Sequence, residues 1–145
     1  FTKTQVEIQE KCPEEYFTLI MRRFMMKIAS KIAAENRCSA LITGESVGQV
    51  ASQTLPALTV TDAASDMLVL RPLIGMDKEE IVAVSRKIET FDISILPYED
   101  CCTVFTPRHP RTRPTVEAVL KAQSALDEAA LIDEAVSGTV FELID

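Results

Sequence analysis

Apolar residues recur along this chain with two different spacings, which predict helices alternating with short strands. From about residue 14 to residue 35 they return every three or four positions, the spacing of one face of a helix. Residues 40–43 and 67–70 are short unbroken apolar runs, typical of strands buried on both faces of a sheet. Weaker patterns predict the other elements: strands over 5–8 and 139–143, helices starting at Ser46 and Asp77, a long loop over 92–114, and a helix in two pieces from Thr115 to about Val136.

Two of the predicted helix starts carry the pattern of a capping box. In this motif the first side chain and the one three residues later each pair with a backbone N–H of the same turn. The pairs are Ser46 with Gln49 and Asp77 with Glu80. Pro56 is expected to end or kink the first helix. The second helix is expected to bury one apolar face, formed by Ile81, Val84 and Ile88.

The order of these elements favours an α/β fold, because strands that alternate with helices build a parallel sheet flanked by helices. The chain has 145 residues, of which 47% are hydrophobic, enough for one domain with a core. In a sheet of this kind, ligands bind beyond the carboxyl ends of the strands. The residues that follow residues 43 and 70 are therefore the first place to look for a site.

The long helix carries cationic residues on two different faces. Arg23, Lys27 and Lys31 recur at four-residue spacing and are expected to form a solvated basic stripe. Arg22 lies instead on a stripe of small and apolar residues, with Met26, Ala29 and Ala33. We therefore expect the Arg22 guanidinium to be held against another group, which could be a phosphate or a structural carboxylate.

The segment 41–53 reads as a strand that runs through Gly44 into a helix. A glycine at this point would let a ligand approach the backbone closely, and the start of the helix would offer unpaired N–H groups to a nucleotide. An ordinary strand-to-helix turn that uses a glycine explains the same pattern, since one glycine is not a phosphate-binding fingerprint.

Two adjacent cysteines, Cys101 and Cys102, fall in the predicted long loop. A cysteine reacts as its thiolate, and the nearby cations would lower the thiol pKa whereas Glu99 and Asp100 would raise it. Buried inert thiols, half of a metal site and a solvated basic loop are the alternatives; the single histidine of the chain disfavours a metal. Arginines alternating with prolines after the cysteines also suit an extended arm on RNA phosphates: Arg108, Arg111 and Arg113. Cys12 and Cys38 are expected to be small core residues.

Charge and hydropathy exclude several classes of protein. The net charge of −7 argues against a surface that binds polyanions throughout, although a local basic patch remains compatible with nucleic acid. No apolar run reaches the roughly 18 residues of a membrane helix, and the first residues lack the apolar segment of a secretory leader, so we expect a cytoplasmic protein with no membrane partner. The chain begins without a methionine, and we expect a longer protein whose missing part lies upstream.

Several longer strings occur together, and as a set they resemble the tRNA 4-thiouridine synthetase family, also called tRNA sulfurtransferase. The resemblance extends from the start of the chain to about Pro114. It is carried, in order, by Cys12-Pro13, Met21-Arg22-Arg23-x-Met25-Met26, Thr43-Gly44-Glu45-Ser46-x-Gly48-Gln49-Val50-Ala51-Ser52-Gln53-Thr54, Arg71-Pro72-Leu73-Ile74-Gly75-x-Asp77-Lys78-Glu79-Glu80-Ile81 and Pro97-Tyr98-Glu99-Asp100-Cys101-Cys102-Thr103-Val104-Phe105.

This resemblance implies that residues 1–145 are the C-terminal part of a PP-loop ATPase domain of the adenine-nucleotide hydrolase type. It implies ATP as co-substrate, with Mg²⁺, and tRNA as substrate: uridine 8 is adenylated on its carbonyl oxygen, and persulfide sulfur displaces AMP to leave 4-thiouridine. A cysteine desulfurase would donate the sulfur, and a small sulfur-carrier protein would pass sulfur on to the thiazole of thiamine. The alternatives are another PP-loop enzyme that modifies or amidates its substrate, and a nucleotide-binding or homodimerising module with inert thiols.

The resemblance also implies roles for individual residues. Arg22, Gly44 and Gln53 match positions that contact ATP. Cys101 matches the sulfur-bearing cysteine, with Cys102 as the alternative. Arg108 and Arg111 would guide tRNA or the triphosphate. The family's serine-glycine-glycine loop and its ferredoxin-like and THUMP modules do not occur in this sequence, and neither does the rhodanese domain that some members carry, so we expect residues 1–145 alone to have little or no catalytic activity.

Overall fold

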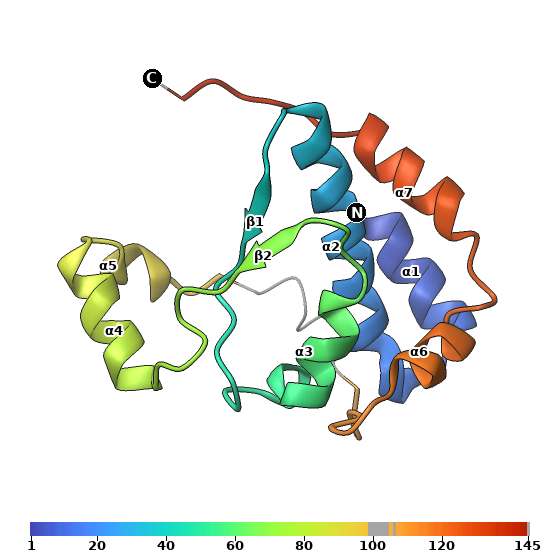
Figure 1. The fold of residues 1–145 in the computed structure, drawn as a ribbon, viewed down its shortest axis with the longest axis horizontal. Helices are drawn as coiled ribbons and strands as arrows, with labels where there is room; N and C mark the ends of the chain where they lie inside the picture. The colour runs from blue at the N-terminus through green and yellow to red at the C-terminus, as the bar shows by residue number, and fades with distance from the viewer. Residues whose placement is uncertain (99–104, 106, 145) are drawn as a thin grey trace.

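The fold consists of a helical body, a small parallel sheet and a helical arm that projects from the sheet (Figure 1). A computed structural model describes residues 1–98, 105 and 107–144. The elements follow in the order α1 (Thr2–Lys11), η1 (Glu14–Tyr16), α2 (Phe17–Glu35), β1 (Ala40–Ile42), η2 (Ala51–Gln53), α3 (Leu55–Asp62), β2 (Leu68–Leu70), α4 (Lys78–Lys87), α5 (Phe91–Ser94), α6 (Val116–Ala122) and α7 (Glu128–Ser137). The predicted long helix and the predicted helix pair near the C-terminus are thus confirmed.

Helix α2 lies at the centre of the body, and α1, α3 and α7 pack against it (Figure 1). Its apolar residues at helical spacing supply about half of the core, which explains why the periodicity over 14–35 was informative. The buried core cluster consists of Ile8, Phe17, Leu19, Ile20, Met21, Phe24, Ala57, Val60, Val119, Leu126 and Leu131. The core therefore belongs to the helices and not to the sheet.

Strands β1 and β2 pair in parallel, with Ala40 opposite Leu68 and Ile42 opposite Leu70. The backbone N–H of Thr43 donates to the carbonyl oxygen of Leu70 at 3.0 Å and extends the ladder by one residue. This confirms a parallel sheet and brings residues 43 and 71 to one edge. The prediction that both strands are buried is wrong for the described residues, because Ile42 is 73% exposed and Leu68 is 64% exposed.

Three predictions in the first half of the chain are wrong. Residues 5–8 are part of α1 and not a strand, since Thr4 and Ile8 are four residues apart on a helix and both are buried. No helix starts at Ser46: residues 43–50 form a loop, and α3 begins after Thr54, whose hydroxyl accepts a hydrogen bond from the Ala57 N–H. Pro56 lies in the first turn of α3, where a missing N–H costs nothing, so it starts a helix and does not end one.

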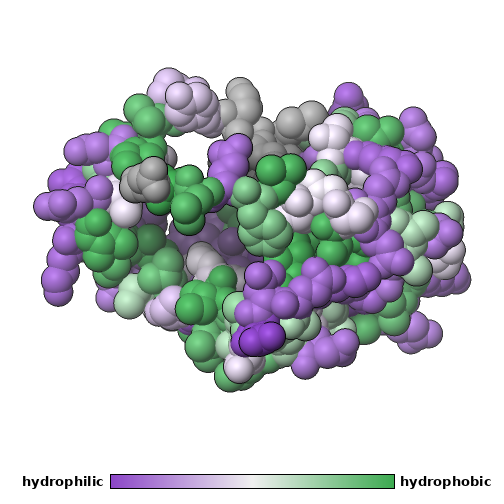
Figure 2. All heavy atoms as spheres, turned by 90° about the horizontal axis from the view of Figure 1, so that it is seen from above, coloured by the Kyte–Doolittle hydropathy of each residue, from purple (hydrophilic) through white to green (hydrophobic). Residues whose placement is uncertain are grey.

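Helices α4 and α5 form an arm that projects from the rest of the chain (Figure 1). The capping box of Asp77 and Glu80 is confirmed, because each side chain accepts the hydrogen bond from the other's N–H. The predicted burial of one α4 face is wrong, however: Ile81 and Val84 are only partly buried, and Ile88 is 61% exposed. Figure 2 shows apolar surface on both sides of the hollow between this arm and the body.

Residues 139–143 do not form the predicted strand. They run as an extended tail beyond α7, on the side of the molecule where β1 begins (Figure 1). Val140, Phe141 and Leu143 are among the most exposed apolar side chains of the described residues. A strand needs a neighbour to satisfy its backbone groups, and in the described part of the chain this segment has none. None of the described helices combines the length and the apolar character that crossing a bilayer requires.

Candidate functional site

A cavity of about 460 Å³ lies between one face of α2 and the loop that follows β1. It is the position at which a parallel α/β sheet places ligands, beyond the carboxyl end of a strand. All three residues expected to contact ATP line it. The cavity is lined by Thr18, Met21, Arg22, Met25, Met26, Thr43, Gly44, Glu45, Val50, Ser52 and Gln53.

Helix α2 supplies one wall because Thr18, Met21, Arg22 and Met25 are spaced three or four residues apart and share one face. The methionine side chains are unbranched and polarisable, so they adapt to a flat aromatic surface. Val50 adds a further apolar side chain from the opposite loop. This part of the cavity suits the ring of a nucleobase.

Glu45 is a buried carboxylate in the opposite wall, only 4% exposed. One of its oxygens, Oε1, accepts from Arg22 Nη2. The other, Oε2, accepts from Arg71 Nε at 2.7 Å and from the Thr43 hydroxyl at 2.9 Å. Both carboxylate oxygens are therefore satisfied, as a buried charge requires. Of the two alternatives for Arg22, the structural carboxylate is present, and Arg22 lines the cavity as well.

Arg71 follows β2 directly and joins two carboxylates. Besides Glu45, it contacts Asp62 at the end of α3, with Nη1 2.9 Å from Oδ1. Burial would lower the pKa of the Arg71 guanidinium, but its hydrogen bonds to Glu45 and Asp62 and their charges outweigh burial and raise that pKa. Arg71 is therefore a permanent cation behind the cavity wall.

Two N–H groups in this cluster are buried without a partner among the described side chains, Arg22 Nε and Arg71 Nη2. A buried donor without an acceptor costs roughly 1–3 kcal/mol, so a ligand that supplied an acceptor would relieve that cost. Arg22 borders the cavity, and phosphate oxygens are the acceptors that its planar fork fits best. Together with the apolar wall, this donor set fits a nucleotide.

The loop over 44–53 is held by its own hydrogen bonds and by the segment after β2. Gln53 Oε1 accepts from the Ser46 N–H at 3.2 Å, and the Ser46 hydroxyl donates to the Met76 carbonyl at 2.7 Å. A Cβ on Gly44 would meet nothing within 4 Å, so the space beside it remains open for a ligand. Gly48 has φ +80°, a conformation that favours glycine. The N–H groups of a helix start, expected at Ser46, are not found here.

The neighbouring Arg23 contradicts the prediction of a solvated stripe. It is 3% exposed; its Nε donates to Gln123 Oε1 at 3.0 Å, and its Nη1 donates to the Val60 carbonyl at 2.7 Å. Lys27 and Lys31 form ion pairs with Glu128 and Asp133 on α7. The prediction is therefore wrong for Arg23, whereas Lys27 is partly exposed and Lys31 is exposed, and both lysines pair with acidic residues of α7.

The segment that follows the two cysteines, residues 105–113, is held against η1 and the start of α2. The ring of Phe105 packs on that of Phe17, with centroids 5.4 Å apart. Arg111 Nε lies 3.0 Å from Glu15 Oε1, and its guanidinium also lies over the ring of Tyr16. The Arg108 backbone N–H donates to Glu14. Cys101 and Cys102 lie outside the described residues.

The two remaining cysteines differ in environment. Cys12 is half-buried and packs against the core, and burial raises the pKa of its thiol, with the Lys11 charge opposing the shift. This fits the prediction of a small core residue. The same prediction is wrong for Cys38, which is exposed just beyond the end of α2.

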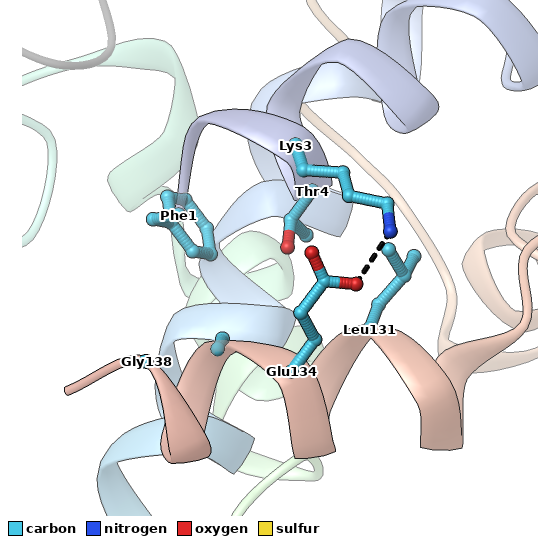
Figure 3. A pocket seen from close by; sticks show the side chains of 7 residues that line it. Phe1, Lys3, Thr4, Leu131, Glu134 and Gly138 are labelled. Atoms are coloured by element: carbon cyan, nitrogen blue, oxygen red, sulfur yellow. Dashed lines mark hydrogen bonds and ion pairs between the residues drawn. The ribbon is translucent and has the colours of Figure 1, made fainter.

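A second cavity, of about 260 Å³, lies between α1 and α7 and contains none of the predicted site residues. Figure 3 shows Lys3 and Glu134 reaching toward each other from the two helices, with Nζ and Oε2 2.5 Å apart. The other residues labelled in Figure 3 also line this cavity: Phe1, Thr4, Leu131 and Gly138. Among the described side chains that line this cavity, the charged ones are Lys3 and Glu134, and they already pair with each other, so they offer a ligand little charge.

Sequence reasoning missed two residues of the first site, Glu45 and Arg71. A signal was available: each is a charged residue placed shortly after one of two strands. Parallel neighbours end at the same edge of a sheet, so charged residues that follow them meet there. Met25, three residues after Arg22 on α2, carries a signal of the same kind, because that spacing puts both side chains on one side of the helix.

Comparison with known proteins gives a consistent result over almost the whole chain. The family model described as "Thiamine biosynthesis protein (ThiI)" matches residues 1–127. A probable tRNA sulfurtransferase of Alkaliphilus oremlandii is 57% identical over 140 residues, which are 97% of this chain and 36% of that protein. One of Brevibacillus brevis is 51% identical over 144 residues, 99% of this chain and 36% of that protein. The chain thus spans little more than a third of these relatives.

A solved structure shares the fold as well. The crystal structure of a 4-thiouridine synthetase–RNA complex with bound ATP superposes with a TM-score of 0.92 at 41% sequence identity. The match covers 99% of this chain and 38% of that protein. The helical body, the sheet and the projecting arm therefore recur together in a longer relative.

Proposed function

The chain belongs to the ThiI family of thiamine biosynthesis proteins, and from this premise we propose that it forms the C-terminal part of the PP-loop domain of an ATP-dependent tRNA sulfurtransferase. The observation that carries the proposal is the cavity between α2 and the loop after β1, in which an apolar wall faces a guanidinium with a buried unpaired N–H. The relative whose structure contains ATP and RNA supports it.

In this proposal the cavity holds ATP. The nucleobase packs among the methionines of α2, and Gly44 allows the nucleotide to approach the backbone of the loop. Arg22 faces the phosphates, and Gln53 shapes the loop through its hydrogen bond to the Ser46 N–H. Mg²⁺ would accompany the triphosphate and neutralise part of its charge.

The sulfur chemistry is assigned to Cys101, with Cys102 as the alternative carrier. ATP adenylates the carbonyl oxygen of uridine 8, pyrophosphate leaves, and persulfide sulfur from the cysteine then replaces AMP to give 4-thiouridine. A cysteine desulfurase transfers sulfur to the cysteine to form the persulfide. The second cysteine, or an external thiol, then forms a disulfide with the first cysteine and leaves the outer sulfur on the uridine. Two residues lie between Cys102 and Phe105, so the chain between these two positions can span at most about 11 Å. Phe105 packs on Phe17, next to Thr18 in the cavity wall, which supports a short path from thiol to nucleotide.

Contact with tRNA is assigned to the segment that carries Arg108 and Arg111, which follows the two cysteines. Both side chains are exposed, and phosphate contacts come mainly from exposed arginine and lysine. Arg111 already pairs with Glu15, so a phosphate would have to share or replace that carboxylate. The exposed apolar residues of β1 and β2 support a longer protein in which further elements cover the faces of the sheet. We place this protein in the cytoplasm, as a possible homodimer that also supplies sulfur for the thiazole of thiamine.

Persulfide loading of the full-length protein tests the proposal. The protein is incubated with a cysteine desulfurase and cysteine, peptides are examined by mass spectrometry for an added sulfur atom, and 4-thiouridine is measured with ATP and tRNA. We expect sulfur on the 101–102 peptide and loss of product in Cys101→Ser. Cys38→Ser, an exposed thiol remote from the cavity wall, is the matched control and should retain activity.

Other outcomes separate the alternatives. If Cys101→Ser forms 4-thiouridine at the wild-type rate, the sulfur-bearing role is assigned to Cys102. Absence of persulfide from both cysteines would contradict sulfur transfer and favour a nucleotide-binding module with inert thiols.

A further inference from the structure

The position of Arg22 in the cavity wall depends on a carboxylate that is itself held by a second arginine. The chain of contacts runs from Arg22 to Glu45 and from Glu45 to Arg71. Arg71 does not line the cavity. The role of Arg71 is therefore not explained by contact with a ligand in this site.

Charge explains why a second arginine is needed. A lone carboxylate in the wall of a triphosphate site would repel the ligand, and a single arginine paired with it would leave the wall neutral. With Arg71 added, Arg22, Glu45 and Arg71 carry a net charge of about +1, because two guanidiniums share one carboxylate. Asp62 pairs with Arg71 as well and offsets part of that charge, but its side chain is 57% exposed, so water weakens this pair more than the pair with buried Glu45.

Geometry points the same way. Glu45 uses one oxygen for Arg22 and the other for Arg71 and Thr43. Glu45 follows β1, and Arg71 follows β2, whose pairing continues through the hydrogen bond from Thr43 to Leu70. The sheet therefore positions Arg71, and Arg71 holds Glu45 through Oε2. The other oxygen of Glu45, Oε1, then holds the Arg22 guanidinium.

We propose that Glu45 and Arg71 are positioning residues for nucleotide binding: Arg71 neutralises and orients Glu45, and Glu45 holds the Arg22 guanidinium toward the phosphates. This inference rests on the proposed function, because it takes the ligand to be ATP. Glu45 and Arg71 act through Arg22, and neither is a catalytic residue.

The test compares ATP with adenosine in the full-length protein, by competition against a fluorescent ATP analogue. Arg71→Gln is expected to weaken ATP binding about tenfold, within the usual range for coupled charged neighbours, while adenosine binding stays within about twofold. A loss of folding would weaken both ligands equally. Asp62→Asn, which removes the exposed partner of Arg71, is the matched control and should change ATP binding less than about twofold.

A double-mutant cycle tests the route through Glu45. In a Glu45→Gln background there is no carboxylate to neutralise, so adding Arg71→Gln should cost less than about threefold in ATP affinity. An equal tenfold loss in both backgrounds would overturn the proposal. Arg71→Lys keeps the cation and should lie within about threefold of the wild type, which also provides a readout if Arg71→Gln folds poorly.

The outcomes distinguish this inference from the proposed function. If the wild-type protein does not bind ATP, the proposed function fails and this inference fails with it. If the wild type binds ATP but Arg71→Gln leaves the affinity unchanged, or lowers ATP and adenosine equally, only the positioning role is overturned.

Discussion

Two faces of α2 carry neighbouring arginines with opposite surroundings. Arg23 is buried in the body, where it joins α2 to α3 and α6 through Val60 and Gln123. Arg22, one residue earlier and about 100° around the helix, lies in the wall of the cavity, and its Nε has no hydrogen-bond partner among the residues that the structure describes. The comparison shows that burial and partners decide the role of a charged residue, and that one face of a helix can serve stability while the next serves a ligand.

The largest effect on stability is expected for Arg23→Ala. It would leave Gln123 Oε1 and the Val60 carbonyl without their donor in a buried place and lower the free energy of unfolding by roughly 3 kcal/mol. Denaturant unfolding measures this, with Arg22→Ala as the comparison: it removes the donor to Glu45 Oε1, but Oε2 keeps Arg71 and Thr43, and water in the cavity that Glu45 lines can replace the lost donor. Equal destabilisation by the two variants would remove the distinction between the faces.

The second prediction concerns binding. Arg22→Ala should weaken ATP binding by about 1.5–3 kcal/mol, the range for hydrogen bonds to a charged group, and Arg23→Ala should weaken it less. Isothermal titration calorimetry on the full-length protein checks this. An equal loss in both variants, or unchanged affinity in Arg22→Ala, would contradict the assignment of the phosphate-facing role to Arg22.

A third variant, Phe105→Ala, tests the anchor at the start of α2. Loss of the ring contact with Phe17 should lower stability by about 1–2 kcal/mol, from the aromatic pair and the burial that accompanies it. The rate of 4-thiouridine formation should fall while ATP affinity is retained, because the cavity wall itself is unchanged. A variant that thiolates at the wild-type rate would show that the anchor is unnecessary for sulfur transfer.

The smallest effects are expected for the ion pairs between α2 and α7. Lys27→Ala and Lys31→Ala should each cost less than about 1 kcal/mol, because the pairs are partly or largely exposed. Lys27 and Glu128 are the less exposed pair, so the cost should be larger for Lys27. Denaturant unfolding of both variants checks this ordering. Repeating it at high salt checks the cause, because a loss of stability that does not become smaller with salt would contradict an electrostatic role.

Much of the fold was predictable where local signals and packing agree. The periodicity of α2 and the capping box of Asp77 rest on residues that are close in sequence, and each of the two strands is marked by its own short apolar run. The failures share a different cause. The pattern Ser46-x-x-Gln49 is a sound helix start, but the Ser46 hydroxyl bonds to Met76, 30 residues away, which the sequence pattern does not show.

The candidate site was predictable only in part for the same reason. Gly44, Gln53 and Arg22 were expected at one cavity, and they line it. Glu45 and Arg71 were not expected, because their role appears only when the two strands are placed side by side. Arg23 was misassigned, since periodicity cannot tell a face that meets water from one that packs against other elements, here through the Val60 carbonyl and Gln123.

The central claim is that the cavity between α2 and the loop after β1 binds ATP, and photolabelling of the full-length protein with 8-azido-ATP tests it most directly. We expect the label in peptides that contain residues 18–26 or 43–53, and we expect an excess of unlabelled ATP to prevent it. Label confined to other regions, such as the cavity of about 510 Å³ beside Arg86 and Phe91, or label that ATP does not prevent, would contradict the claim.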